Sequence, residues 1–386
     1  MVHRQMKSIS NPLKAFYDDC SAPTGTKTFE HEAPRVAIII LNWNSWRDTL
    51  DCLESLHRIS YPSYLIIIVD NGSTDGSLDK IRAYCEAASS AGMISIIPHH
   101  QENHLAEPTY KQNGITTEFK QIVPDKSDKR EILIIRNDQN YGYAVGNNIG
   151  MRFALKCRSD AVLLLNNDTV VDPEFLTELV KALQDQQSAG FFGPKVYYYE
   201  RNGRKDVISH AGGVLNMLTG TCHPIGKDEV DAGKYDVVRE VDYIEGSCVL
   251  VRAEVIDQIG LLDPIFFAYW EDVDWSLRGS NEGWKSIYVP TARVWHKTYA
   301  SDVAGMAFYR MVRNWFWFMR KHSSPIRYQI FLLYYFSWQF WLISASCVFY
   351  RRSSLRAFWR AVFEGIFRQS VGNQHEAMES ALQPLV

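Results

Sequence analysis

The sequence lacks the cysteine spacing of a zinc framework or a disulfide-bonded scaffold. Its seven cysteines are scattered along the chain, with no close pair among them. Structural zinc sites and small disulfide-bonded domains both need cysteines at short, regular spacings. The sequence therefore excludes both classes, and its isolated thiols are typical of a reducing compartment.

A strong excess of charge is also absent. The formal net charge is −3 over 386 residues, so charge alone suggests no nucleic-acid partner. No signal peptide is visible, and we expect residues 1–34, which are polar, to form a flexible arm. The length allows two domains, or one large domain with an appendage.

The glycine-rich loop of a dinucleotide-binding domain is missing as well. No G-x-G-x-x-G pattern follows the first apolar run, which ends in the bulky sequence Asn-Trp-Asn-Ser-Trp at 42–46. A second small-residue segment, 140–150, opens a predicted helix, and a helix start of this kind favours anionic groups such as phosphate.

The sequence has instead a series of apolar runs that each end in polar residues. The runs at 35–41, 64–69, 131–135 and 161–165 predict buried strands, and apolar residues at helical spacing lie between them. This alternation predicts an α/β fold with a Rossmann-like, mostly parallel sheet flanked by helices. Runs without alternation indicate strands that are covered on both faces.

Further elements are expected beyond this core. Residues 190–199, 241–252 and 286–289 read as strands. A helix is expected with Asp172 as N-cap and Pro173 at its first position, and another at Glu271 and Asp272. Residues 99–130 are expected to be a surface insertion, and the glycine-rich residues 200–240 a mobile flap.

The segment from Ala161 to Asp168 is the strongest candidate for chemistry. An apolar run ends there in Asn166, Asn167 and Asp168, at the carboxyl end of a strand, where open α/β sheets bind ligands. A carboxylate flanked by amides can hold a divalent cation together with phosphate oxygens. The alternative is an ordinary turn rich in Asn and Asp.

Other polar residues are expected near the same rim. Asp70 and residues 140–148 also follow predicted strands, whereas Glu271, Asp272 and His296 come later in the chain. Each has an ordinary explanation, such as a cap, a helix-dipole charge or a half-buried histidine. Together they suit transfer of a group from a nucleotide diphosphate, which needs a cation for the leaving group and a proton-accepting carboxylate.

Several motifs in this order resemble the family 2 glycosyltransferases, which are inverting enzymes of the GT-A fold. The likeness covers roughly residues 35–300 and is closest to the branch that includes rhamnosyltransferases of cell-surface polysaccharides. The motifs are LNWN (Leu41 to Asn44), VDNGSTDGS (Val69 to Ser77), NYGYAVGNN (Asn140 to Asn148), LLLNND (Leu163 to Asp168), YWEDVDW (Tyr269 to Trp275) and VPTARVWH (Val289 to His296).

The resemblance implies a role for each matched residue. Asp168 and His296 would bind Mn²⁺ or Mg²⁺, Asp272 would be the general base, and Glu271 would shape its surroundings. Asn166 stands where many relatives carry Asp, which puts the choice of ion in question. The residues implied in donor binding are Leu41, Trp43, Asn44, Asp70, Gly142, Asn147, Asn166 and Asn167, and those on the acceptor side are Trp270, Arg313 and Asn314.

Residues 301–386 are expected to form an aromatic-rich helical extension of the 35–300 transferase domain. The stretch 328–350 carries no charge and is long enough to cross a bilayer, but Trp338 and Trp341 lie in its middle. A helical hairpin on the cytoplasmic face of the plasma membrane is the preferred interpretation. The alternatives are buried helices, a homodimer face, or a true membrane span.

The sequence thus predicts transfer of a sugar from dTDP-rhamnose or a UDP-sugar to a lipid-linked or polysaccharide hydroxyl. Two alternatives remain open at this point. A sugar nucleotidyltransferase would also use an α/β sheet and a cation, but it would carry a glycine-rich basic loop after the first strand. A non-catalytic carbohydrate-binding relative would not need Asp272 or His296.

Overall fold

The computed structural model describes residues 33–88, 94–99, 109–112, 115–118, 130–298, 306–341, 344–345 and 352–368. The chain divides into two units, Met1–Ala33 and Pro34–Val386, and the elements described below belong to the second. The predicted arm at 1–34 and most of the predicted insertion at 99–130 lie outside the described residues. Within that insertion, β4 (Thr109–Gln112) and β5 (Ile115–Glu118) pair as an antiparallel hairpin.

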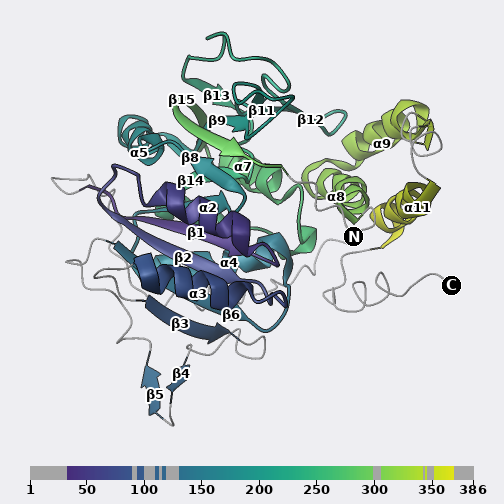
Figure 1. The fold of residues 1–386 in the computed structure, drawn as a ribbon. Helices are drawn as coiled ribbons and strands as arrows, with labels where there is room; N and C mark the ends of the chain where they lie inside the picture. The colour runs from purple at the N-terminus through teal and green to yellow at the C-terminus, as the bar shows by residue number, and fades with distance from the viewer. Residues whose placement is uncertain are drawn as a thin grey trace, which may run out of the picture. The chain divides into compact units, whose positions relative to one another are not determined.

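The first half of the unit is the expected parallel sheet. The apolar runs form strands that lie in the order β7-β1-β2-β6-β3, all parallel. The residues of β1, β2 and β7 and the centre of β6 (Ile132, Leu133, Ile134 and Ile135) are almost entirely buried because helices cover both faces: α2 and α3 lie on one and α4 on the other (Figure 1). The elements are β1 (Val36–Asn42), α2 (Trp46–Leu56), β2 (Tyr64–Asp70), α3 (Ser77–Ala88), β3 (Ile94–His99), β6 (Arg130–Asn137), α4 (Gly142–Lys156) and β7 (Ala161–Asn166).

The second half continues the same sheet with mixed strand directions. Next to β7 lie β14, β9, β15 and β13, of which β14 runs antiparallel to both its neighbours. The elements are β8 (Thr169–Val171), α5 (Phe175–Asp185), β9 (Ala189–Tyr198), β10 (Ile208–His210), β11 (Gly213–Asn216), β12 (Thr221–Pro224), β13 (Arg239–Val241), β14 (Cys248–Arg252), α6 (Ala253–Ile259), η3 (Pro264–Phe266), α7 (Glu271–Asn281) and β15 (Lys285–His296).

Three expected boundaries are wrong in this half. The predicted strand 241–252 is two strands, because residues 242–247 leave the sheet between β13 and β14. The predicted short strand at 286–289 is part of the twelve-residue β15, which keeps pairing with β9 past a register shift after Val289. Helix α5 begins at Phe175, and the Asp172 side chain accepts a hydrogen bond from the amide of Glu174 instead of capping the helix.

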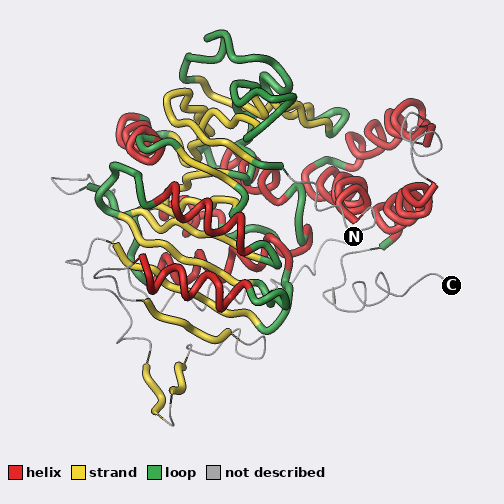
Figure 2. Tube along the Cα trace, in the orientation of Figure 1, coloured by secondary structure: helices red, strands yellow, loops and turns green. Residues whose placement is uncertain are grey.

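Residues 200–240 contain more regular structure than the expected irregular flap. Three short strands and the start of β13 alternate there with long loops (Figure 2). Buried Lys195 on β9 holds the segment, since its Nζ lies 2.8 Å from Asp231 and also contacts Asp236. Such a buried ammonium needs its partners, because an unpaired charge in the interior is costly.

The C-terminal part is helical and aromatic, as expected. Its elements are α8 (Met306–His322), α9 (Pro325–Tyr334), the π-helical turn η5 (Tyr335–Gln339) and α11 (Arg352–Phe367). Phe316, Phe331, Tyr335 and Phe358 form the centre of a second hydrophobic core that also includes Phe266 and Val273 of the sheet domain. Among the described residues, no helix is both long and apolar enough for a membrane crossing.

Candidate active site

The polar ends of β1, β2 and β7 lie together at one edge of the sheet. Asn42 pairs with Asp70 in the parallel register, and Leu41 pairs with Asn166. The strands share a direction, so their carboxyl ends reach the same rim. The predicted convergence of Asp70 and Asp168 on one rim is thus present in the structure.

Asp70 is buried, and both of its carboxylate oxygens have protein partners. Oδ1 accepts a hydrogen bond of 2.8 Å from the Asn42 side chain, and Oδ2 accepts one of 3.2 Å from the amide of Ser73. Asn44 holds the same loop, because its Oδ1 accepts from the amide of Thr74 at 2.8 Å. Of the residues expected to bind the donor, Trp43, at 46%, and Asn44 are the exposed ones.

The start of α4 is less open to phosphate than its sequence suggests. The amide of Gly142 donates to Asn140 Oδ1 at 2.8 Å, and the amide of Ala144 donates to the Phe267 carbonyl at 3.0 Å. Asn147 is buried and donates to the Tyr143 carbonyl of its own helix. Several of the amides that a phosphate would use therefore already have protein partners.

Two glycines of this motif leave space that side chains from other elements fill. Gly142 has φ +83°, and a Cβ there would lie 2.6 Å from the Phe267 ring. A Cβ on Gly146 would lie 2.5 Å from a methyl group of Leu41. The lack of a side chain at these two positions thus lets Phe267 and Leu41 pack against α4.

Asp168 and His296 meet, although 127 residues separate them in the sequence. Asp168 Oδ1 lies 3.0 Å from His296 Nε2, at the point where β7 turns into β8 and β15 ends. Burial lowers the pKa of His296, but the hydrogen bond and charge of Asp168 outweigh it, so the pKa lies above its ordinary value. The sequence prediction that these two side chains lie together is met by this distance.

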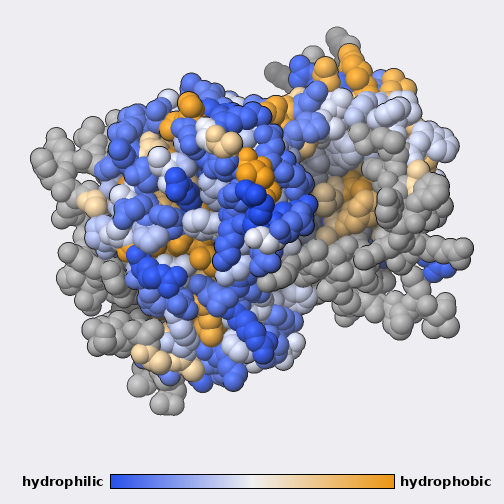
Figure 3. Space-filling view, turned by 45° about the horizontal axis from the view of Figure 1, so that its top comes forward, coloured by the Kyte–Doolittle hydropathy of each residue, from blue (hydrophilic) through white to orange (hydrophobic). Residues whose placement is uncertain are grey.

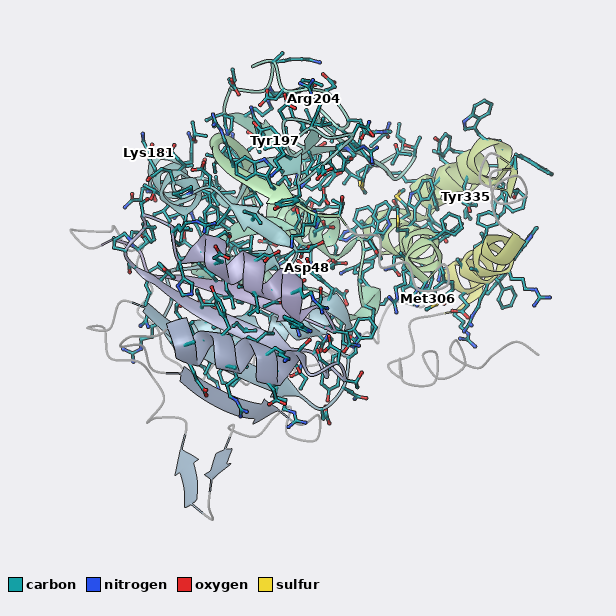
Figure 4. The ribbon with its side chains drawn as sticks, in the orientation of Figure 1. Asp48, Lys181, Tyr197, Arg204, Met306 and Tyr335 are labelled. Carbon is teal, nitrogen blue, oxygen red and sulfur yellow. The ribbon has the colours of Figure 1, made fainter. Side chains whose placement is uncertain are left out.

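Lys297, the residue that follows β15, supports this pair. Lys297 donates its amide to the Asp168 carbonyl at 2.9 Å. Its Nζ lies 2.7 Å from Asp48 and 2.6 Å from Asp51, both on α2 (Figure 4 labels Asp48). The three contacts hold the ends of β7 and β15 against α2.

Asp168 and His296 suit a divalent cation that takes its other ligands from phosphate. The Asp168 side chain is partly exposed, at 20%, whereas His296 is largely buried, and its Nδ1 has no hydrogen-bond partner among the described residues. Mg²⁺ and Mn²⁺ sites at nucleotides often have only one or two protein ligands, with phosphate oxygens and water as the rest. No group of three or more metal-binding side chains occurs in the part of the chain that the structure describes.

The amides of Asn166 and Asn167 differ in what they contact. The Asn167 side chain donates to Thr49 Oγ1 on α2 at 3.0 Å. The Asn166 backbone amide donates to the Ser247 carbonyl at 2.9 Å. Both side chains are partly exposed, so each could also reach a bound ligand.

Asp272 lies in the first turn of α7 and is connected to the end of β7 through residues 245–247. Its Oδ2 accepts a hydrogen bond from the Gly246 amide, and its Oδ1 accepts one from the Val273 amide, both at 2.8 Å. Burial raises the pKa of Asp272 to about 6 against the lowering effect of the Gly246 bond. Glu271 beside it is buried, and burial followed by the charge of Asp272 raises its pKa well above the ordinary value.

Residues 245–247 join these two parts of the site, and within them the sequence marked only Gly246, as a possible point of close approach. Residues 245–247 contact Asn166 through the Ser247 carbonyl and Asp272 through the Gly246 amide. The Tyr143 hydroxyl donates to the Gly246 carbonyl at 2.6 Å. The single glycine within a predicted strand was the available signal, because such a glycine often marks a close approach.

The three residues predicted on the acceptor side connect α8 with the loop that precedes α7. Asn314 is fully buried, and its Nδ2 lies 2.8 to 2.9 Å from the carbonyls of Phe266, Ala268 and Tyr269. Arg313 is buried and bonds to the Asn314 side chain, and the Trp270 indole donates to the Met311 carbonyl. These contacts support the strained loop before α7, in which Phe267, Tyr269 and Trp270 all have positive φ.

The family model described as Glycosyltransferase like family 2 matches residues 34–316 of this chain, which is well over half of its length. The chain belongs to glycosyltransferase family 2. The expected resemblance is thereby confirmed, as is the GT-A type of α/β fold with its aromatic helical extension. Membership of this family argues against the sugar nucleotidyltransferase alternative.

Two curated family 2 relatives illustrate the range of similarity. A low-salt glycan biosynthesis hexosyltransferase, Agl10 of Haloferax volcanii, is 28% identical over 199 residues, covering 49% of this chain and 61% of the relative. An N-acetylglucosaminyl-diphospho-decaprenol L-rhamnosyltransferase of Mycobacterium tuberculosis is 28% identical over 151 residues, covering 36% and 47%. The chain thus spans about half the length of these curated relatives.

A solved glycosyltransferase structure shares less of its sequence with this chain than the two relatives above do. The mannosyltransferase PcManGT from Pyrobaculum calidifontis, in complex with GDP-Man and Mn²⁺, has a TM-score of 0.46 at 12% identity. The alignment covers 96% of this family 2 chain and 87% of that protein.

Proposed function

We propose that this family 2 protein transfers a sugar from a nucleotide-diphosphate donor to a hydroxyl group with inversion at the anomeric carbon. The observation that carries the proposal is the position of Asp272, whose carboxylate shares the segment 245–247 with the rim that holds Asp168 and His296. A proton acceptor and a cation-binding pair on one rim are the two groups that such a displacement needs.

Asp272 is suited to be the general base. Each of its oxygens accepts one backbone amide, which fixes the carboxylate and leaves lone pairs for an incoming hydroxyl. A pKa of about 6 lies close to neutral pH, where a base is both ionised and able to hold the transferred proton. The acceptor oxygen bonds to the anomeric carbon, its proton passes to Asp272, and the diphosphate leaves with the electrons of the broken bond.

Asp168 and His296 would hold Mn²⁺ or Mg²⁺ on the leaving-group side. A cation there would neutralise charge on the departing diphosphate. Lys297, which follows β15, keeps the two strand ends in place through α2. The donor sugar, dTDP-rhamnose or a UDP-sugar, and the lipid-linked or polysaccharide acceptor belong to this proposal, and the names of the similar rhamnosyltransferases support them.

Substitution of Asp272 by Asn tests this function. We expect donor hydrolysis and transfer to fall by about 10²- to 10⁴-fold, the usual contribution of a positioned base. Donor affinity measured by calorimetry should stay within about twofold, because Asn preserves the shape of the side chain. Asp228→Asn, at an exposed ion pair with Arg201, is the matched control. Near-normal turnover of Asp272→Asn would refute the role.

A second part of the proposal concerns location at the cytoplasmic face of a membrane. Apolar residues on α9 and α11 are exposed at helical spacing: Ile326, Ile330 and Leu333 on α9, and Trp359, Phe363 and Phe367 on α11. Figure 3 shows apolar side chains gathered on the right-hand side, where these helices lie. Exposed Arg327, Arg356 and Arg368 could meet anionic headgroups.

Vesicle flotation tests this location. We expect the protein to float with vesicles of phosphatidylglycerol and phosphatidylethanolamine, and the double variant Phe363→Ser, Phe367→Ser to lose at least half of that binding. Val237→Ser removes an equally exposed apolar side chain from residues 200–240 and is the control. If the double variant floats as well as the control, the C-terminal helices do not form the membrane contact.

A further inference from the structure

One polar pair on the rim has no role in the reaction described above. His210 on β10 is buried, and its Nε2 lies 3.1 Å from Glu245 Oε2 and 3.0 Å from Ser247 Oγ. Its other ring nitrogen, Nδ1, is buried and has no hydrogen-bond partner within the part of the chain that the structure describes. Buried polar groups with missing partners are rare enough to need an explanation.

Glu245 belongs to the segment that joins the two parts of the site. Its neighbours in sequence, Gly246 and Ser247, contact Asp272 and Asn166. Its charge acts on both sides, since it contributes to the raised pKa of His296 and to that of Asp272. Glu245 therefore belongs to a segment that contacts both parts of the site, through the Gly246 amide on Asp272 and the Ser247 carbonyl on Asn166.

The carboxylate of Glu245 remains available to a ligand. Its side chain is 38% exposed, whereas His210 is 2% exposed. Burial lowers the pKa of His210, so its imidazole is neutral at neutral pH and leaves the charge of Glu245 uncompensated. His210 thus orients the carboxylate and does not form a full ion pair with it.

A second metal site does not explain the pair. In the described ranges, Glu245, His210, Asp168 and His296 do not come close enough together to form a cluster of three metal ligands. A buried histidine that only filled the core would not need an acidic partner at the rim. A fixed carboxylate is, however, a good acceptor for the hydroxyl groups of a sugar.

We propose that Glu245, oriented by His210, accepts hydrogen bonds from hydroxyl groups of the donor sugar and selects which sugar is transferred. The inference rests on the proposed function, because the sugar of a nucleotide donor must lie between the leaving group and the base. Sites that hydrogen-bond a substrate hydroxyl discriminate strongly against sugars that lack it. Glu245 is therefore a specificity-determining residue, and His210 is a positioning residue.

The test compares a sugar nucleotide with the same nucleotide without its sugar. Calorimetry with Mn²⁺ would measure dTDP and dTDP-rhamnose, and UDP and UDP-GlcNAc, on the wild-type protein and on Glu245→Gln. For the donor that binds, we expect Glu245→Gln to lower the affinity for the sugar nucleotide by roughly 10- to 100-fold, as expected for loss of a hydrogen bond to a charged group. The bare nucleoside diphosphate should change by less than about twofold, because it does not reach Glu245.

Two further variants separate recognition from a structural effect. Glu240→Gln changes an exposed carboxylate on β13 that pairs with Lys285, and it should alter neither affinity. His210→Phe fills the buried space without the Nε2 contact to Glu245, and it should weaken binding of the sugar nucleotide selectively but less than Glu245→Gln. This selectivity is a readout that a purely structural role of His210 would not produce.

The outcomes are distinguishable. Equal weakening of both ligands by Glu245→Gln, or no weakening of either, would overturn the role of Glu245 while leaving the transferase proposal intact. If neither the nucleoside diphosphate nor the sugar nucleotide binds the wild-type protein with Mn²⁺, both proposals fail.

Discussion

The two halves of the site differ in how far the protein satisfies their polar groups. In the half built from β1, β2 and α4, the buried side chains of Asp70 and Asn71 each make several hydrogen bonds, although Oδ1 of the neighbouring Asn137 has no partner among the described residues. In the half built from Asp168 and residues 245–296, Glu271 Oε2 and His296 Nδ1 are buried without a hydrogen-bond partner in the described part of the chain, and the pKa of Asp272 is raised. The first half holds a shape, whereas the second retains groups that can respond to a ligand.

The comparison implies that substitutions in the two halves should have different effects. A change in the satisfied half should lower stability first and activity as a consequence. A change in the half with unsatisfied groups should lower activity or ligand binding and leave stability unchanged or improved. The predictions below test this difference, beginning with the largest expected effect.

Asp168→Ala should abolish the Mn²⁺-dependent part of donor binding. The substitution removes the carboxylate that lies 3.0 Å from His296 and that would hold the cation. Donor hydrolysis with Mn²⁺ should fall by at least about 100-fold, because the charge of the leaving diphosphate is no longer neutralised. Calorimetry with and without Mn²⁺ measures the binding, and thermal unfolding without metal should change little.

Asp185→Ala is the control for this prediction, since Asp185 is exposed at the end of α5. Unchanged donor affinity of Asp168→Ala in the presence of Mn²⁺ would remove Asp168 from the cation site. A large fall in the stability of Asp168→Ala without metal would mean that Asp168 stabilises the fold as residues of the first half do, and it would contradict the difference between the two halves.

Asn71→Ala should have the opposite signature. The Asn71 side chain is 1% exposed and contacts Asn137, Asn140, Tyr141 and Gly142 through four hydrogen bonds. Loss of these bonds leaves buried donors and acceptors unpaired, so we expect the free energy of unfolding to fall by about 2–3 kcal/mol. Urea denaturation measures it, with exposed Asn281→Ala as the control. A loss below about 0.5 kcal/mol would contradict the assignment of Asn71 to a stabilising network.

The satisfied half was also the half that the sequence predicted best. Apolar runs that end in Asn42, Asp70 and Asn166 specify strands, and parallel order then brings their ends together. What the pattern could not show was that Asp70 and the start of α4 already have protein partners. That depends on tertiary hydrogen bonds between segments about 70 residues apart, such as those of Asn71.

In the other half, the sequence predicted which single residues matter but not which side chains surround them. Asp168 and His296 meet as expected, but the roles of His210, Glu245 and Tyr143 depend on β10, on the break between β13 and β14, and on α4. No local pattern marks a buried histidine or an exposed glutamate as partners. Arg313 and Asn314 were placed near the site by resemblance, yet only the packing of α8 shows that they bond to the loop that precedes α7.

The pH dependence of turnover should reflect Asp272. A base must be ionised, so with a pKa of about 6 the rate should rise as the pH increases through 6 and level off above 7. Below that pKa, the rate should fall about tenfold per pH unit. Donor hydrolysis at saturating Mn²⁺ between pH 5 and 8 measures it. A flat profile across this range would mean that Asp272 titrates elsewhere or does not act as the base.

Glu271→Gln should stabilise the protein at neutral pH, which is the smallest effect and the sharpest test of the comparison. Burial and the neighbouring Asp272 raise the pKa of Glu271, so the folded protein holds a proton that the unfolded chain releases above about 4.5. Stability therefore falls as the pH rises from the unfolded pKa toward the folded one. Gln removes this dependence and should add on the order of 1 kcal/mol near pH 7.

Denaturation at pH 5 and pH 8 measures the difference, with exposed Glu86→Gln as the control. If Glu271→Gln destabilises the protein as Asn71→Ala does, Glu271 is ionised and satisfied in the fold, and the two halves do not differ in the way described.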